Sequence, residues 1–302
     1  MSPLNGSALQ VHEAVRWATS ELASAGVPSP RLDCEILLAH ALGWKRARLY
    51  AFPEFEPPAE QCEAFVALVE RRKQHEPVPY IVGQREFFGL NLLVDRRVLI
   101  PRPETELLVQ HALESASRLQ SGEQALTLVD VGTGCGCVAV SLAVSLPRAT
   151  VYATDVSTDA LEVAALNAGR HGVGSRVHVC LGNLLEPLPG PVHIIVANLP
   201  YISTGYLANL DRDVLDYEPR LALEGGEDGL QLVCALLERA GHWLLPHGVI
   251  WLEIGAYHGP QAVALAQRCF PAARIELRQD YAHLDRNLGI HMDRNLGIHT
   301  GP

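Results

Sequence analysis

The sequence has no long apolar run, since no stretch of its 302 residues approaches the eighteen apolar residues that a membrane-spanning helix needs. Residues 1–24 also lack the basic segment followed by an apolar stretch that is typical of a secretion signal. The seven cysteines are odd in number and scattered, which suits free thiols better than a disulfide framework. We therefore expect a cytoplasmic protein that does not insert into a membrane.

Positive charge is also scarce, because 24 Lys and Arg stand against 34 Asp and Glu, for a net charge of −10. Nine basic and ten acidic residues lie within 1–85, which leaves 15 and 24 for 86–302, so the negative charge belongs to the second part. Phosphate neutralisation supplies most of the non-specific affinity for nucleic acids, so direct nucleic-acid binding is not expected. The 48% apolar content excludes a disordered chain.

Hydrophobic periodicity divides the chain into three parts. Within residues 1–85, apolar residues recur at helical spacing over 9–25, 31–42 and 59–75, which predicts a small helical domain. Residues 86–103 have a strand-like pattern that ends at Pro101 and Pro103, which predicts a bridging hairpin or linker. From 104 to 302, strand and helix patterns alternate. This alternation predicts an α/β domain with a mainly parallel sheet and ligands at the carboxyl ends of its strands.

A glycine-rich loop follows the first strand of the α/β part and precedes a helix. Its residues are Gly132, Thr133, Gly134, Cys135 and Gly136. The next strand ends in Asp155, whose carboxylate can bind both ribose hydroxyls of an adenosine. No lysine follows the loop, so a Walker-type phosphate site is not expected. The loop and the acid together indicate a nucleoside cofactor, which is either a dinucleotide or S-adenosylmethionine.

The strand over 192–197 delivers a tetrapeptide at its carboxyl end, Asn198, Leu199, Pro200 and Tyr201. It resembles the signature of methyltransferases that act on a planar, conjugated nitrogen, and this favours S-adenosylmethionine. Such a nitrogen is a poor nucleophile, so two acceptors that bind its hydrogens can aim its lone pair at the methyl group. The Asn198 side-chain oxygen and the Leu199 carbonyl would be these acceptors. Pro200 would fix the backbone conformation, and the Tyr201 ring would pack against the planar substrate group. Taken alone, the tetrapeptide can also be only a turn after a strand.

Four further stretches extend the resemblance over nearly the whole chain. They are 29–33 (SPRLD), 79–83 (PYIVG) continuing to Gly89, 99–106 (LIPRPETE), and 217–230, which begins YEP and ends GGEDGL. On these motifs the chain resembles the peptide chain release factor N5-glutamine methyltransferases. These enzymes transfer a methyl group from S-adenosylmethionine to the glutamine of a Gly-Gly-Gln motif in release factors.

The resemblance implies a seven-stranded Rossmann-like methyltransferase domain over 104–302, with the helical-bundle domain 1–85 recognising the protein substrate. It implies that residues 132–136 hold the methionine part of the cofactor, Asp155 the ribose, and Asn183 with Leu184 the adenine. Residues 198–201 would hold the substrate glutamine, and the release factor would be the partner. No metal is expected, because Cys135 and Cys137 have no second pair and the thirteen histidines show no metal-binding spacing.

Two departures from the family keep alternatives open. The family usually has Asp where this chain has Asn183, which keeps an acceptor for the adenine amino group but loses the charge. It usually has proline at the position of Leu199, and the tetrapeptide with leucine is also similar to that of ribosomal-RNA adenine N6-dimethyltransferases. The net negative charge of residues 86–302 argues against this RNA-modifying alternative. A catalytically inactive binding protein with the same fold is a further alternative.

The tail repeats the heptapeptide DRNLGIH, at 285–291 and again at 293–299. We interpret this as a local duplication and assign it no catalytic role.

Overall fold

The protein is described by a computed structural model, which covers residues 9–119 and 125–292. Its chain forms two compact units. The first contains residues up to 84 together with the later segment 211–217, and the second contains 85–210 and the residues from 218 onward.

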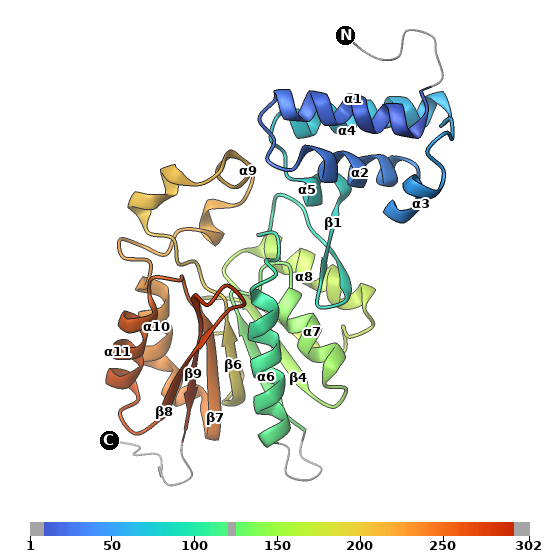
Figure 1. Ribbon diagram of the computed structural model, residues 1–302. Coiled ribbons are helices and arrows are strands. Elements are labelled where there is room, and N and C mark those ends of the chain that lie inside the picture. The colour runs from blue at the N-terminus through green and yellow to red at the C-terminus, as the bar shows by residue number, and fades with distance from the viewer. Residues whose placement is uncertain (1–8, 120–124, 293–302) are drawn as a thin grey trace. The chain divides into compact units, whose positions relative to one another are not determined.

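Helices make up the first unit (Figure 1). They are α1 (Val11–Ser24), α2 (Pro30–Ala41), α3 (Arg46–Ala51), α4 (Ala59–Lys73) and α5 (Val78–Val82), with the short α9 (Arg212–Leu215) contributed by the later segment. In α1 the residues Val11, Ala14, Ala18 and Leu22 are buried, at the three- and four-residue spacing of one helical face. The backbone N–H of Gln10 donates to the Glu13 carboxylate at 3.1 Å, so a capping contact begins this helix.

The segment 211–217 is held to the helices of the first unit by a buried arginine. Arg72, which is 4% exposed, donates to Asp33 at 2.8 Å and pairs with Asp213 at 2.7 Å. The Tyr217 hydroxyl donates to the Gln74 carbonyl oxygen at 2.7 Å. A stretch that lies far along the chain therefore belongs to the helical unit, which periodicity did not predict.

A seven-stranded sheet forms the centre of the second unit, in the order β5-β4-β3-β6-β7-β9-β8 (Figure 1). All neighbouring pairs are parallel except those of β9, which runs antiparallel to both β7 and β8. The prediction of a seven-stranded, mainly parallel sheet is confirmed. The strands are β3 (Thr127–Val131), β4 (Thr150–Asp155), β5 (Val177–Leu181), β6 (Val192–Ala197), β7 (Leu244–Glu253), β8 (Arg274–Gln279) and β9 (Asp285–His291).

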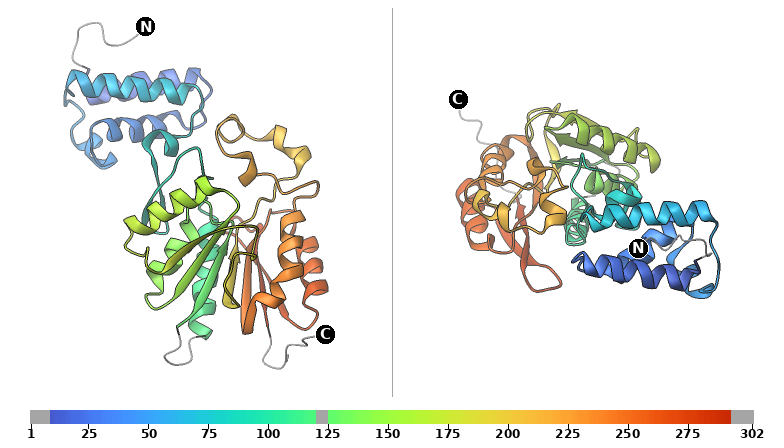
Figure 2. Two further views of the ribbon diagram at one scale, coloured as in Figure 1. Left: turned by 180° about the vertical axis from the view of Figure 1, so that it is seen from behind. Right: turned by 90° about the horizontal axis from the view of Figure 1, so that it is seen from above.

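Helices cover the sheet in two layers (Figures 1 and 2). On one side α10 and α11 pack together over alternate strand residues such as Val129, Ile195 and Ile250. On the other side, Trp251 of β7 donates to Ser115 of α6 at 2.9 Å. The helices are α6 (Thr105–Leu119), α7 (Cys137–Ser145), α8 (Thr158–Arg170), α10 (Gln231–Ala240) and α11 (Gly259–Cys269). Both faces of the central strands β3 and β6 and of the second half of β7 are buried, which explains their continuous apolar runs.

Shorter elements complete this unit. They are the hairpin strands β1 (Gln84–Phe87) and β2 (Leu90–Leu93), and the 3₁₀ turns η1 (Thr204–Asn209), η2 (Arg220–Ala222) and η3 (Gly241–Trp243). The first copy of the heptapeptide repeat is strand β9, and the second copy lies outside the described residues. Across 9–119 and 125–292, none of the helices combines the length and the apolar composition needed to cross a membrane.

Candidate functional site

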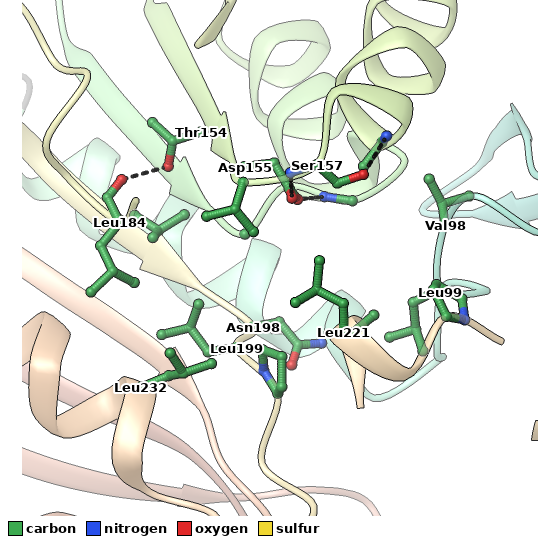
Figure 3. Close-up of a pocket in the computed structure, with 18 of the residues that line it drawn as sticks. Val98, Leu99, Thr154, Asp155, Ser157, Leu184, Asn198, Leu199, Leu221 and Leu232 are labelled. Carbon is green, nitrogen blue, oxygen red and sulfur yellow. Dashed lines mark hydrogen bonds between the residues drawn. The ribbon is translucent and has the colours of Figure 1, made fainter. Parts of the chain in front are cut away.

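A cavity of about 350 Å³ opens at the carboxyl ends of β3, β4 and β6 in the second unit (Figure 3). This is the edge of a parallel sheet where ligands bind, and the volume lies in the range of small-molecule sites. Figure 3 shows Asp155 on one side of the cavity and Asn198 with Leu199 on the other. The predicted site residues that line it are Gly132, Gly134, Asp155, Asn183, Leu184, Asn198, Leu199 and Pro200.

The glycine loop forms a tight turn from β3 into α7. Gly132 has φ +72°, and a Cβ at this position would lie only 3.1 Å from Leu199 Cδ2. Gly136 has φ +81°, and its Cβ would lie 3.1 Å from the Cβ of Ala164 on α8. Both positions need glycine because a side chain would be strained there and would meet a packed neighbour. The loop backbone therefore packs closely against Leu199 and against α8.

Asp155, at the end of β4, is tied to this loop. One carboxylate oxygen accepts the backbone N–H of Gly134 at 3.0 Å, and the other accepts that of Ser157 at 2.9 Å. Each oxygen of an ionised carboxylate can accept more than one hydrogen bond. Asp155 therefore fixes the loop and can still accept hydrogen bonds from a ligand in the cavity.

Thr133, Cys135 and Gly136 are not among the residues that line the cavity. The Thr133 hydroxyl donates to Asp130 at 2.6 Å, and the Cys135 carbonyl accepts from Asn167 at 2.9 Å. Asp130 also accepts the Ala139 backbone N–H at 3.1 Å. Burial raises the pKa of Asp130 to about 7, although these two hydrogen bonds favour its ionised form. These hydrogen bonds stabilise the turn, although the residues that make them do not line the cavity. Asp130 was not identified from the sequence as one of them.

The loop after β5 carries Asn183 and Leu184 to the cavity. Leu184 has φ +52°, an uncommon value for a residue with a side chain. Its carbonyl oxygen accepts the Thr154 hydroxyl at 2.8 Å (Figure 3). Backbone strain of this kind is concentrated at binding sites, where neighbouring contacts stabilise it.

Asn198 follows β6 directly, and its side-chain amide nitrogen donates to the Thr105 hydroxyl at 3.0 Å. That hydroxyl is 2.7 Å from a carboxylate oxygen of Glu253, the last residue of β7. Thr105 is 2% exposed and Glu253 is 1% exposed. Burial raises the pKa of Glu253 to about 7, while the hydrogen bond from Thr105 lowers it. Sequence reasoning missed Glu253, although it is a carboxylate at the end of an apolar strand, as is Asp155.

Tyr201, the last residue of the tetrapeptide, is not among the residues that line the cavity. A Cβ added at Gly255 would lie 3.2 Å from a ring carbon of Tyr201, so its ring lies beside the end of β7. Burial raises the pKa of its hydroxyl, and the Glu253 carboxylate adds to this effect. Leu199, in contrast, is 5% exposed and packs over Gly132.

Some of the other lining residues come from the two motif stretches 99–106 and 217–230. They are all apolar: Leu99, Pro219, Leu221 and Ala222. Arg102 donates to Glu218 at 2.6 Å, and the Ile100 backbone N–H donates to the same carboxylate at 3.3 Å. These contacts join the two motif stretches, which line the cavity through the adjacent residues Leu99 and Pro219.

Comparison with known proteins supplies the family. Two family models match the chain, "PrmC N-terminal domain" over residues 13–83 and "Methyltransferase small domain" over 103–212. The release factor glutamine methyltransferase of Nitratidesulfovibrio vulgaris is 39% identical over 289 residues, which is 95% of this chain and 96% of that protein. The release factor glutamine methyltransferase of Moorella thermoacetica is 42% identical over 280 residues, covering 92% and 97%. The chain belongs to the release factor glutamine methyltransferase family.

This membership confirms the family prediction and the order of a helical N-terminal domain before a methyltransferase domain. Among solved structures, the catalytic domain of hMettl16 in complex with an RNA hairpin matches with a TM-score of 0.55, at 13% identity. The match covers 76% of this chain and 84% of that one, and it shows a shared fold alone. As a member of the release factor glutamine methyltransferase family, the chain is an enzyme that uses a methyl donor of the S-adenosylmethionine type.

Proposed function

We propose that this protein transfers the methyl group of S-adenosylmethionine to the side-chain amide nitrogen (N5) of the glutamine in the Gly-Gly-Gln motif of peptide chain release factors. The observation that carries this proposal is the setting of Asn198. It lines the cavity at the end of β6, and its amide nitrogen is occupied by Thr105 at 3.0 Å. A carboxamide has one donor and one acceptor end, so its oxygen is the end that remains for a substrate N–H.

The cavity suits S-adenosylmethionine by its donors and its shape. Asp155 would accept the ribose hydroxyls, and the loop at Gly132 and Gly134 would approach the methionine part through bare backbone. Asn183 and Leu184 would flank the adenine, as expected from their place in the lining. Thr133, Cys135 and Gly136 would act by shaping the loop. When bound, this cofactor supplies an electrophilic methyl group on a positively charged sulfur.

The substrate amide would be oriented by acceptors at the end of β6. Asn198 Oδ1 and the Leu199 carbonyl oxygen would accept its two hydrogens and so direct the nitrogen lone pair toward the methyl group. Leu199 in place of proline still closes the cavity beside Gly132 by packing. No base is needed before transfer, because the amide nitrogen becomes acidic only after it is methylated. Release factors would be the protein partner, and free thiols at all seven cysteines support a cytoplasmic location.

The test is mass spectrometry of the Gly-Gly-Gln peptide after a release factor is incubated with the enzyme and S-adenosylmethionine. Asn198→Ala is expected to lower the transfer rate by roughly a hundredfold or more, the usual cost of removing one aligned hydrogen-bonding group from a reacting centre. Calorimetric affinity for S-adenosylmethionine should survive. Asn209→Ala, at the exposed end of η1 and outside the cavity lining, is the matched control.

Two outcomes would contradict the proposal. Methylation of ribosomal RNA without methylation of the factor would favour the adenine N6-methyltransferase alternative. Absence of both transfer and S-adenosylmethionine binding would favour the inactive binding protein.

A further inference from the structure

Asn198 belongs to a buried series of hydrogen-bonded polar groups in the second unit. The series leads from the Asn198 amide nitrogen to Thr105 Oγ1 at 3.0 Å, and from there to Glu253 Oε2 at 2.7 Å. The three side chains come from the end of β6, the first residue of α6 and the end of β7. The parallel pairing of β6 with β7 places Ala197 opposite Leu252, so the residues that follow these two are neighbours at the same edge.

The number of hydrogens on each group decides which group donates and which accepts in these hydrogen bonds. An ionised carboxylate can only accept, so the single hydroxyl hydrogen of Thr105 is donated to Glu253. The Thr105 oxygen then accepts, and the Asn198 amide must present its NH₂ end to it. The two ends of a carboxamide have nearly the same shape, so packing alone does not distinguish its two orientations.

We propose that Glu253 is a positioning residue that acts through Thr105 to fix the orientation of the Asn198 carboxamide, so that its oxygen rather than its NH₂ meets the substrate amide. This proposal rests on the proposed function, because the oxygen is the end that a glutamine N–H requires. In the reversed orientation two NH₂ groups would face each other and the acceptor would be lost.

The protonation state of Glu253 controls this orientation. Its pKa is raised to about 7 by burial, lowered by Thr105, Arg286 and Asn198, and raised by Glu104. When protonated, Glu253 can donate to Thr105, whose own hydrogen then becomes available to the Asn198 oxygen. The reversed orientation of the amide becomes competitive in that state. The groups that face Glu253 come from three places. They are Glu104 just before α6 and Thr105 at its first residue, Asn198 and Tyr201 after β6, and Arg286 and Asn287 on β9.

The experiment measures the single-turnover rate of methyl transfer to a release factor between pH 5.5 and 8.5. With a group of pKa near 7 that acts in its ionised form, the wild-type rate should be about tenfold lower at pH 6 than on its plateau at high pH. Glu253→Gln cannot ionise, so its rate should lose this acid limb and stay near the wild-type value at pH 6. Affinity for S-adenosylmethionine, measured by calorimetry, should stay within threefold of wild type.

Variants at Thr105 test the link independently of Glu253. Thr105→Val removes the hydroxyl at nearly constant volume and should lower the plateau rate by about tenfold, whereas Thr105→Ser should restore most of the rate and the acid limb. Ser115→Ala is the matched control, because it removes another buried hydrogen bond between α6 and β7, the one from Trp251. It should keep the wild-type rate and pH profile.

A Glu253→Gln enzyme with the wild-type rate and acid limb would overturn the proposal. So would a Thr105→Val enzyme that behaves as wild type, and this variant decides the matter if Glu253→Gln does not fold. A wild-type protein that fails to methylate the factor removes the proposed function and this proposal with it. If the wild-type protein methylates the factor and the Glu253→Gln and Thr105→Val variants behave as wild type, the result contradicts this proposal alone.

Discussion

Asp155→Ala is expected to weaken binding of S-adenosylmethionine by roughly a hundredfold. Under the proposed function, the carboxylate accepts two ribose hydroxyls, and each hydrogen bond to a charged group contributes about 1.5–3 kcal/mol. Two bonds at the lower end of this range amount to about 3 kcal/mol, and each 1.4 kcal/mol is about tenfold in affinity. The variant also releases the Gly134 and Ser157 N–H groups, so the loop that approaches the ligand loses an anchor.

Asp155→Asn sharpens the test, because an amide has only one oxygen. The two carboxylate oxygens accept different backbone N–H groups at 3.0 and 2.9 Å, so the new NH₂ must face one of them. We expect this variant to bind at least tenfold more weakly than wild type, despite its nearly identical shape.

The assay for both variants is isothermal titration calorimetry with S-adenosylmethionine, with circular dichroism to verify the fold. Asp159→Ala is the control, since it removes a nearby exposed acid in the first turn of α8 that does not line the cavity. An Asp155→Ala affinity within threefold of wild type would refute the ribose assignment. If Asp159→Ala weakens S-adenosylmethionine binding equally, the effect comes from the loss of negative charge in general and not from a hydrogen bond to the ribose.

Two further predictions concern stability. Arg72→Leu should lower the unfolding midpoint of the helical unit by about 10 °C or more in a thermal melt followed by circular dichroism. The buried Asp33 carboxylate loses its ion-pair partner, at a cost of about 3 kcal/mol, while the partly exposed Asp213 loses Arg72 but keeps its contact with His75. An unchanged midpoint would show that the pair does not hold the segment 211–217. Gly136→Ala should destabilise the second unit by about 1–2 kcal/mol or more in urea titration, since φ is +81° and the new Cβ would lie 3.1 Å from Ala164; a stability equal to wild type would contradict this steric argument.

Much of the architecture could be predicted because it depends on local patterns. Helical spacing predicted α1, α2 and α4 within a few residues, and alternation of strands and helices predicted the parallel sheet. The short helices α3 and α5 were missed, because they have only 6 and 5 residues and show too little periodicity.

The candidate site was partly readable for a similar reason. Gly132, Asp155 and Asn198 each follow or end a predicted strand, and the carboxyl ends of parallel strands meet at one edge of a sheet. The sequence therefore determined that these residues gather in one place, even without knowledge of the strand order. The cavity that they line agrees with this expectation, while their individual roles stay predictions.

Only the tertiary structure decided which buried side chains form hydrogen bonds with the residues at this edge of the sheet. Thr105 lies 93 residues before Asn198 and 148 residues before Glu253, and no periodic pattern relates positions so far apart. Their contact exists because β7 pairs directly with β6 and because α6 covers that pair of strands. Likewise, Arg72 meets Asp213 only after the chain has returned to the helical unit from the methyltransferase domain. Local sequence determines which elements form and where each ends, whereas long-range packing decides which buried polar groups become hydrogen-bond partners.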